Sequence, residues 1–187
     1  DSRFSETRRK MGISASMHDF GRVVIVCRMK HETPHDDVAY ECFHYERTLA
    51  VLPLGGNKSS IVVTLPTNMS ETLMTMSKAA FNEDIRKRFD NRLGKMELIG
   101  KRFPYPLVAV HANRFVATRF ALIGDAAVGM HPVTAHGFNL GLRGQNTLAK
   151  KIRSAQERNI DIGSSAVLES YQSTHRRVTV PIYLGTN

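Results

Sequence analysis

The sequence predicts a mixed fold of helices and strands, in which one domain is interrupted by an inserted antiparallel β-rich domain. Three observations indicate this. Short segments rich in β-branched and aromatic residues, separated by polar turns, dominate the first third of the chain. Helical periodicity begins near residue 70 and returns near residue 139. Strand-like sequence lies between the two helical regions, so the chain ends as strand, loop, helix and helix.

The strands of the insert are predicted from runs of apolar residues. A continuous apolar run covers residues 23–27, and residues 38–45, 49–54 and 60–65 follow as further strands, with a turn at residues 55–57. Because the polar segments between these strands are short, we expect an antiparallel meander.

Helices and further strands follow the meander. Leu73, Met76 and Ala80 recur at helical spacing, so a helix is predicted over residues 70–92 with Ser70 as its N-cap. The chain then returns to strand, which we expect Pro104 and Pro106 to interrupt. The remaining predicted elements are a strand over residues 96–110, a hairpin of residues 114–116 and 120–123, a loop over residues 126–136, and helices over residues 139–158 and 165–178.

Composition places the chain among globular cytoplasmic proteins. Of its 187 residues 42% are hydrophobic and 23% are charged, enough for a core and too few charges for disorder. Cys27 and Cys42 indicate thiols of a reducing compartment, and no apolar run is long enough for a membrane span. The net charge of +9 comes from runs in which acids and bases alternate, and no nucleic-acid-binding signature accompanies it. Peripheral contact with a membrane surface stays open.

Residues 120–142 carry the strongest functional signal. An apolar strand ends at Gly124, and Asp125 follows where the chain opens into a loop that Pro132 stiffens. A carboxylate there can accept hydrogen bonds from the hydroxyls of a sugar or polyol. Gly137 permits close approach, and the N–H groups that begin the next helix favour a negative charge. A lone Gly-Asp pair is also typical of a plain strand–loop–helix corner.

The whole string resembles the second FAD-binding motif of the class A aromatic hydroxylases, the family of para-hydroxybenzoate hydroxylase and the ubiquinone-biosynthesis hydroxylases. The resemblance implies that Asp125 binds the ribityl chain of FAD and that the Pro132 carbonyl lies near the substrate ring. It also implies that backbone N–H groups of Gly137, Phe138, Asn139 and Leu140 face the flavin and stabilise its negative charge. The matching residues are Gly124, Asp125, Ala126, Ala127, Pro132, Gly137, Asn139 and Gly141.

The sequence departs from the family pattern at three places within this motif. Val128 replaces the usual histidine, the pair at residues 135–136 is Ala-His instead of Gly-Gln, and Gly144 replaces a common aspartate. The argument from the helix N-terminus needs only backbone, so it survives these changes. Roles that depend on the replaced side chains do not carry over.

The opening residues resemble the family's short Asp-Gly motif, Asp-Gly-x-x-Ser-x-x-Arg. Asp1, Ser5 and Arg8 match it, and Ser2 stands in place of the glycine. In the family this motif contacts FAD and takes part in the use of NAD(P)H, so Asp1 and Arg8 are expected cofactor contacts. A plain polar tail is the alternative.

The resemblance implies an α/β, mixed α+β architecture. Residues 1–12 and 111–187 would be parts of a Rossmann-like FAD-binding domain, and residues 13–110 an antiparallel β-sheet substrate domain with helices. The family's glycine-rich nucleotide loop is not found in the 187 residues. We therefore expect a fragment, inactive alone, whose missing N-terminal part belongs to the same protein.

The segment from residue 41 to residue 54 looks like the substrate-domain sheet of the ubiquinone-hydroxylase branch. Phe43, Tyr45, Leu52 and Pro53, together with Pro132, are candidates to line an aromatic pocket. Each of the first four is equally well explained as sheet core. No catalytic side chain is identified, and His111, His131 and His136 have no spacing that predicts a metal site.

The resemblance implies an FAD-dependent monooxygenase that uses NAD(P)H and O₂ to hydroxylate an aromatic substrate, such as a polyprenyl phenol or another quinone precursor. One alternative is a flavoprotein of the same fold that reduces or halogenates without hydroxylation, although the chain lacks the tryptophans typical of halogenases. Another is a basic binding module without enzymatic activity. Whether the protein forms a homodimer stays open.

Overall fold

The computed structural model of the chain describes residues 2–131 and 136–186. It contains two compact units: unit 1 comprises Asp1–Phe20 and Val108–Asn187, and unit 2 comprises Gly21–Leu107. Unit 2 is thus formed by one continuous stretch between the two stretches of unit 1. The functional division predicted at residues 12 and 110 stays a prediction, because the units are defined by contacts alone.

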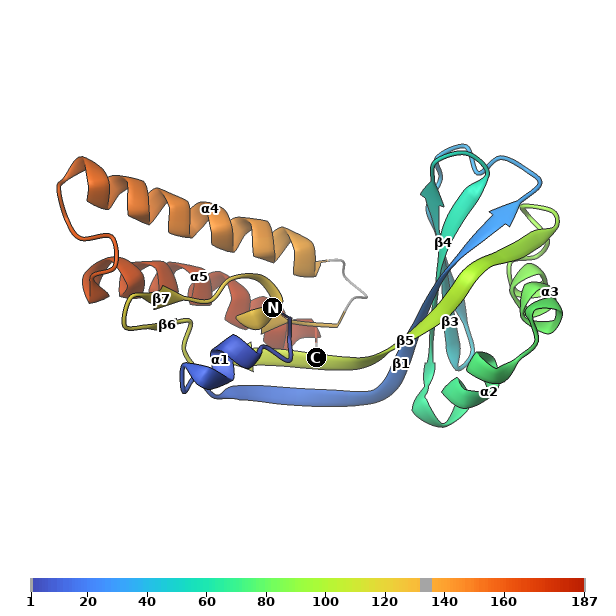
Figure 1. The fold of residues 1–187 in the computed structure, drawn as a ribbon, viewed down its shortest axis with the longest axis horizontal. Coiled ribbons are helices and arrows are strands. Elements are labelled where there is room, and N and C mark those ends of the chain that lie inside the picture. The colour runs from blue at the N-terminus through green and yellow to red at the C-terminus, as the bar shows by residue number, and fades with distance from the viewer. Residues whose placement is uncertain (1, 132–135, 187) are drawn as a thin grey trace. The chain divides into compact units, whose positions relative to one another are not determined.

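Unit 2 is built on an antiparallel sheet (Figure 1). The predicted strands at residues 38–45, 49–54 and 60–65 are confirmed within two residues of their ends, as is the turn at residues 55–57. The strand predicted over residues 23–27 is much longer: alternate burial continues from Val23 to His31, and the strand also extends back to Ala15 through residues that are exposed or half-buried. In sheet order the strands are β2 (Tyr40–His44), β3 (Arg47–Leu54), β4 (Lys58–Pro66), β1 (Ala15–His31) and β5 (Met96–Ala112).

Two helices, α2 (Ser70–Thr75) and α3 (Lys78–Arg88), cover one face of this sheet (Figure 1). They follow the 3₁₀ turn η1 (Thr67–Met69). Ile61 of β4 and Ile25 of β1 are fully buried in the same apolar cluster as Phe81 of α3. Because side chains alternate along a strand, the neighbouring residues of β1 and β4 point to the other face of the sheet.

The prediction of a single helix over residues 70–92, capped by Ser70, is wrong. Met76 has φ −51° and ψ 140°, which ends α2, and the Ser77 hydroxyl caps α3 by accepting a hydrogen bond from the Ala80 amide at 3.2 Å. The guanidinium of Arg102 stabilises the break by donating to the carbonyls of Leu73 and Met76, both at 2.6 Å. Because Arg102 lies 26 residues after Met76, no local sequence pattern could have predicted this break in the helix.

The predicted interruption of the following strand is also wrong, since β5 runs without a break through Pro104 and Pro106. A proline removes one donor from a strand and is tolerated where that donor is not needed. Both prolines lie in an exposed stretch of β5, residues 103–106.

Unit 1 contains the predicted hairpin, although its strands are short: β6 (Val116–Ala117) pairs antiparallel with β7 (Phe120–Ala121). The second strand therefore ends before Gly124 instead of at it. The 3₁₀ turn η2 (Gly124–Ala126) follows, and β8 (Val128–Gly129) then pairs antiparallel with β5 through Val110 and His111. The other elements of the unit are α1 (Glu6–Lys10), α4 (His136–Glu157) and α5 (Ser165–Thr186).

Both long helices of unit 1 are longer than predicted. Helix α4 begins at His136, three residues earlier than predicted, and α5 continues through Pro181 to Thr186. Tyr171 of α5 is fully buried, and its hydroxyl donates to the Leu122 carbonyl at 2.7 Å. This hydrogen bond ties α5 to the segment just before η2. Among the described residues, no helix combines the length and the hydropathy needed to cross a bilayer.

A close contact between Gly144 and His175 packs α4 against α5. A Cβ atom on Gly144 would lie 2.9 Å from Nε2 and 3.1 Å from Cε1 of His175. The imidazole is 2% exposed and stacks on the ring of Tyr171, with 5.7 Å between ring centroids. The site where the family commonly has an aspartate thus has no room for a side chain here.

We expect Gly144→Ala to destabilise the protein by about 1–2 kcal/mol, because overpacking outweighs the helix propensity of alanine. Gly141→Ala is the matched control, since its Cβ would meet the Gly124 Cα at an ordinary 3.6 Å. That change should stabilise the helix by about 0.5–1 kcal/mol. Urea unfolding measures both, and equal signs for the two changes would refute the packing argument.

Two buried histidines, His111 and His175, should make the stability of the fold depend on pH. Burial, followed by the charge of Arg176, lowers the pKa of His111, and burial, followed by the charge of Arg143, lowers the pKa of His175. Both rings also contact Phe115, with centroid separations of 5.4 and 5.6 Å. Their neutral forms are therefore the ones that the folded state accommodates.

A histidine whose folded pKa lies below its unfolded value binds protons more readily in the unfolded state. Stability should therefore be greatest above the unfolded pKa of about 6.5 and fall as pH drops below it, by at most about 1.4 kcal/mol per pH unit for each histidine. Urea unfolding at a series of pH values measures the slope. The variant His175→Phe should reduce the slope, whereas the exposed His18→Gln should leave it unchanged; the reverse result would contradict the assignment.

Candidate functional site

Asp125 lies in the turn η2, where the chain passes from the β6–β7 hairpin to β8. Gly124 begins the turn with φ +57°, a conformation that glycine adopts without strain. The Asp125 side chain is 40% exposed, and its Oδ2 accepts a hydrogen bond from Arg3 Nη2 at 3.2 Å. The described part of the chain provides no hydrogen bond to Oδ1, so this oxygen can accept from a ligand.

Arg3 holds the carboxylate of Asp125 in place. Its Nη1 also donates to the Val108 carbonyl at 2.9 Å, which anchors the guanidinium to β5. Sequence reasoning did not single out Arg3. The sequence offered one indication of its role: Arg3 is a positively charged residue within the opening motif, at a position where the family pattern does not specify a residue type.

Arg8 joins the opening segment to the turn that carries Asp125. The side chain is 3% exposed, and it donates to the Ala126 carbonyl at 2.9 Å and to the Arg3 carbonyl at 3.0 Å. Ser5 caps α1 by accepting from the Arg8 amide at 2.9 Å. Burial, followed by the charge of Arg9, lowers the pKa of Arg8. The guanidinium thus supports the turn from behind, and the other predicted contact of this motif, Asp1, lies outside the described residues.

Helix α4 begins beside the same turn. It packs against η2, and Gly141 comes close enough that its Cβ would lie 3.6 Å from the Gly124 Cα. The amides of the first turn of a helix have no acceptor within it, and the helix dipole makes this end positive. A Cβ on Gly137 would have no atom of residues 2–131 or 136–186 within 4 Å, so none of these residues blocks a ligand from the backbone there.

The predicted flavin-facing residues of α4 differ in their surroundings. Phe138 is 76% exposed and Asn139 is exposed, whereas the Leu140 side chain is 6% exposed and belongs to the core of unit 1. Leu140 is also the fifth residue of α4, so its amide has an acceptor within the helix. Pro132, the predicted contact to both cofactor and substrate, lies outside the described residues.

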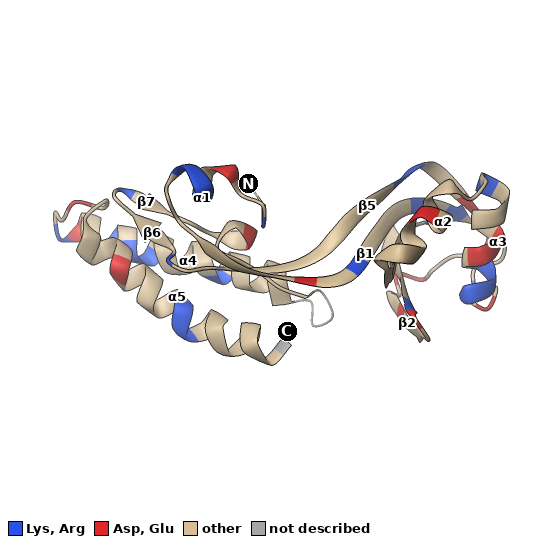
Figure 2. Cartoon of the chain, turned by 90° about the horizontal axis from the view of Figure 1, so that it is seen from below, with Lys and Arg blue, Asp and Glu red and all other residues tan. Residues whose placement is uncertain are grey.

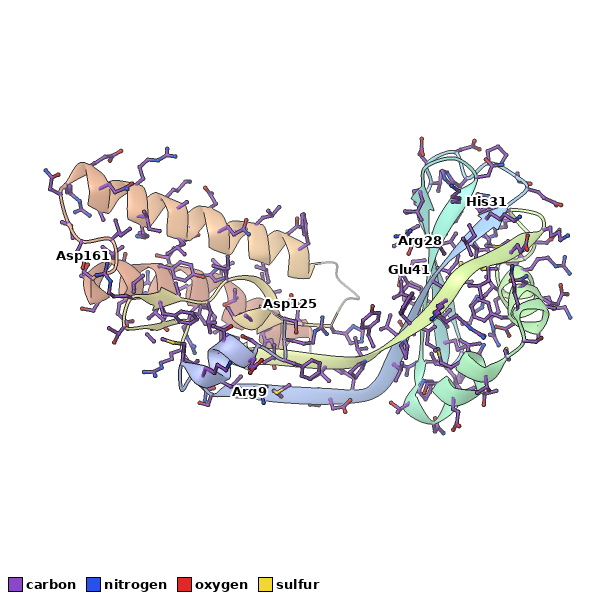
Figure 3. All side chains as sticks on the ribbon, viewed as in Figure 1. Arg9, Arg28, His31, Glu41, Asp125 and Asp161 are labelled. Atoms are coloured by element: carbon purple, nitrogen blue, oxygen red, sulfur yellow. The ribbon has the colours of Figure 1, made fainter. Side chains whose placement is uncertain are left out.

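The arrangement fits a cofactor that combines a polyol with a group carrying negative charge. The free oxygen of Asp125 can accept from a hydroxyl, and the N-terminus of α4 can stabilise an anion. Both features lie on elements that contact each other within unit 1. Figure 3 shows Asp125 near the start of α4 and Asp161 at the other end of that helix. FAD, with its ribityl chain and its isoalloxazine ring, meets these requirements.

The predicted substrate residues lie in unit 2 and do not all share a surface. Phe43 lies opposite Thr48 of β3, so the two side chains share a face of the sheet. Leu52, four residues after Thr48, points to that same face because side chains alternate along a strand. Leu49 and Val51 point to the face that α2 and α3 cover, so Phe43 and Leu52 lie on the other face. They are 72% and 39% exposed. Pro53 points to the opposite face, and Tyr45, in the turn between β2 and β3, is 99% exposed. Of these four residues, Phe43 and Leu52 therefore share a face of the sheet without being cross-strand neighbours.

Some of the charged side chains elsewhere form ion pairs, and one of the two thiols is buried. Within the mixed run on α3, Arg86 and Lys87 pair with Glu83, and Arg88 pairs with Asp84. Figure 2 shows Lys and Arg distributed over elements of both units, with acidic residues between them. Burial raises the pKa of Cys27 to about 12, which removes it as a nucleophile. Among the described residues, no three His, Cys, Asp or Glu side chains gather as a metal site would require.

Comparison with solved structures supports the fold. The chain is similar to Pseudomonas aeruginosa PqsL in complex with 2-aminobenzoylacetate, with a TM-score of 0.75 and 17% identity over 100% of this chain and 51% of that one. It is also similar to CmlS, a flavin-dependent halogenase, with a TM-score of 0.73 and 20% identity over 94% of this chain and 33% of that one. At such identities the likeness concerns the fold alone, and it confirms the predicted mixed architecture.

Comparison with known sequences identifies the family. The chain is 50% identical over 187 residues to ubiquinone hydroxylase UbiM of Neisseria meningitidis, covering 100% of the chain and 41% of that protein. It is 38% identical over 176 residues to ubiquinone hydroxylase UbiL of Rhodospirillum rubrum, covering 94% of the chain and again 41% of the relative. The chain thus spans less than half the length of these relatives. Residues 1–182 match the FAD binding domain family, and the chain therefore belongs to that family.

Proposed function

We propose that the whole protein, meaning this chain with any further sequence its gene encodes, is an FAD-dependent monooxygenase that hydroxylates an aromatic compound with NAD(P)H and O₂. The observation that carries the proposal is the contact between the Asp125 turn and α4, which supports a polyol acceptor next to a helix N-terminus that can bind an anion. The names of the two relatives, both ubiquinone hydroxylases, support an aromatic quinone precursor as substrate.

Each part of the site has a distinct role in this proposal. Asp125 accepts hydrogen bonds from the ribityl hydroxyls, and Arg3 and Arg8 hold its turn in position. The first-turn amides of α4, near Gly137, stabilise negative charge on the ring system. Pro132 stays a predicted contact to the substrate. When bound, FAD supplies the redox chemistry that accepts electrons from NAD(P)H and activates O₂.

Further parts of the proposal concern what lies beyond these residues. The pyrophosphate of FAD is normally held by a glycine-rich loop, which we propose lies in sequence of the same protein outside the 187 residues. We place the protein in the cytoplasm with peripheral membrane contact, because a polyprenyl substrate is apolar and a net charge of +9 favours anionic lipid. A homodimer stays a prediction. A reductase of the same fold would oxidise NAD(P)H without consuming O₂, so an oxygen electrode separates the two activities.

In the whole protein, Asp125→Ala should weaken FAD binding by about 10- to 100-fold, because a hydrogen bond to a charged acceptor contributes about 1.5–3 kcal/mol. Asp161→Ala is the control, since it removes a carboxylate at the other end of α4. Fluorescence titration of the apoprotein with FAD measures both affinities. Unchanged affinity in Asp125→Ala would remove this residue from the site.

Arg8→Met should also weaken FAD binding, because it leaves the Ala126 and Arg3 carbonyls without their donor and loosens the turn. A loss of about 1.5–3 kcal/mol in unfolding free energy should accompany it. Arg9→Met removes the same charge from an exposed neighbour and should change neither quantity. The two variants are compared by urea unfolding and FAD titration, and equal losses in both would show that net charge, not the buried contact, is responsible.

A further inference from the structure

Two imidazoles are buried in the same cluster of unit 1. His175 on α5 is 2% exposed, His111 on β5 is 8% exposed, and both rings contact the ring of Phe115. Nδ1 of His175 and Nε2 of His111 have no hydrogen-bond partner within residues 2–131 and 136–186. Buried polar atoms almost always have a partner, so two orphan nitrogens in one cluster need an explanation.

The surroundings of the two rings accommodate only the neutral imidazole. The charges that act on the rings are those of Arg143 on α4, Arg176 on α5 and the other histidine, and within the described part of the chain no aspartate or glutamate is among them. The remaining titratable neighbours are the aromatic hydroxyls of Tyr171 and Tyr183. Proton uptake by a ring would therefore add a buried positive charge among cations and a donor without an acceptor.

The contact between α5 and α4 encloses His175. Figure 1 shows the two helices side by side. A Cβ on Gly144 would lie only 2.9 Å from Nε2 of His175, so the imidazole packs directly against the backbone of α4. Because the ring is buried in this contact, water can solvate a charged imidazole only if the two helices separate.

Helix α4 also forms part of the candidate cofactor site. Its first turn, near Gly137, lies about two helical turns before Gly144. Gly141, between these two glycines, packs on Gly124 next to Asp125. Over so short a distance a helix moves as one body, so separating α4 from α5 also displaces the first turn of α4 from the turn that carries Asp125.

We propose that His175 and His111 form a proton-operated switch that couples the packing of α4 to the binding of FAD. With both rings neutral, α4 packs against α5 and its N-terminus stabilises the negative charge of the cofactor. Proton uptake by the rings opens this contact, moves the first turn of α4 away from Asp125 and weakens FAD binding. By linkage, bound FAD keeps protons off the rings. The inference rests on the proposed function in taking FAD as the ligand at this helix end.

The first test is the affinity of the whole protein for FAD as a function of pH. The opened state takes up protons near the ordinary histidine pKa of about 6.5, whereas the packed state takes them up only at lower pH. Affinity should therefore be greatest above about pH 6.5 and fall about tenfold or more between about pH 7.5 and about pH 5.5, since linkage allows up to about tenfold per pH unit for each histidine. Fluorescence titration of the apoprotein measures it, at pH values where circular dichroism shows intact secondary structure.

Variants assign the pH dependence to the two rings. His175→Phe combined with His111→Phe keeps two buried rings that cannot take up protons, so FAD affinity should change less than about threefold over the same range. The exposed His18→Gln is the control and should behave like the unchanged protein. Gly144→Ala should imitate proton uptake, because its Cβ pushes α4 away from His175, and should weaken FAD binding already at neutral pH.

Hydrogen exchange of the backbone amides tests the movement of α4 without any cofactor. After correction for the intrinsic effect of pH, exchange in α4 should increase at acid pH in the unchanged protein and not in the double phenylalanine variant. The proposal is overturned if α4 exchange does not respond, or if FAD affinity falls equally in the protein and the double variant. A protein that binds no FAD at any pH would refute the proposed function, while the exchange measurement would still decide whether the switch exists. Hydroxylation with FAD affinity independent of pH would refute this inference alone.

Discussion

The turn that carries Asp125 depends on two arginines from the start of the chain. Arg8 is buried and satisfies backbone carbonyls of both segments, and Arg3 bridges the Asp125 carboxylate to β5. A buried guanidinium is costly unless its donors are used, so this arrangement persists only while both segments keep their places. The opening residues, which could have been a plain polar tail, are therefore part of the structure on which the candidate site rests.

The elements that could be predicted from the sequence are those determined by residues close together in the chain. The strands of unit 2 follow from runs of apolar residues, and the site around Gly124 and Asp125 was predicted from the resemblance of the whole string to a family motif. What could not be predicted depends on partners distant in the chain. Arg102 stabilises a helix break near Met76, Arg3 orients Asp125 from 122 residues away, and neither pairing has a periodic or compositional signal. The predicted aromatic pocket stays a prediction; alternation puts Phe43 and Leu52 on one face and Pro53 on the other, which the apolar run alone did not indicate.

The face of the unit 2 sheet that α2 and α3 do not cover can influence which ligand the protein prefers. Helices α2 and α3 bury one face, which leaves the other free to present side chains without any loss of core. Residues on that face contribute little to stability, so their chemistry can vary with the ligand. Fold and cofactor site can thus stay the same while the preferred ligand changes.

The two units are connected by strands instead of loops, since β1 passes from unit 1 to unit 2 at Phe20 and Gly21, and β5 returns at Leu107 and Val108. Loops usually absorb insertions and deletions, whereas a residue added to a paired strand reverses the face of the side chains beyond it unless a bulge takes it up. On β1 this applies from Val23 to His31, where burial alternates, while Gly21, with φ +63°, already departs from strand geometry. A change of length between Val23 and His31 would therefore exchange core and surface, whereas the turn at residues 55–57 can change length without reversing a strand face.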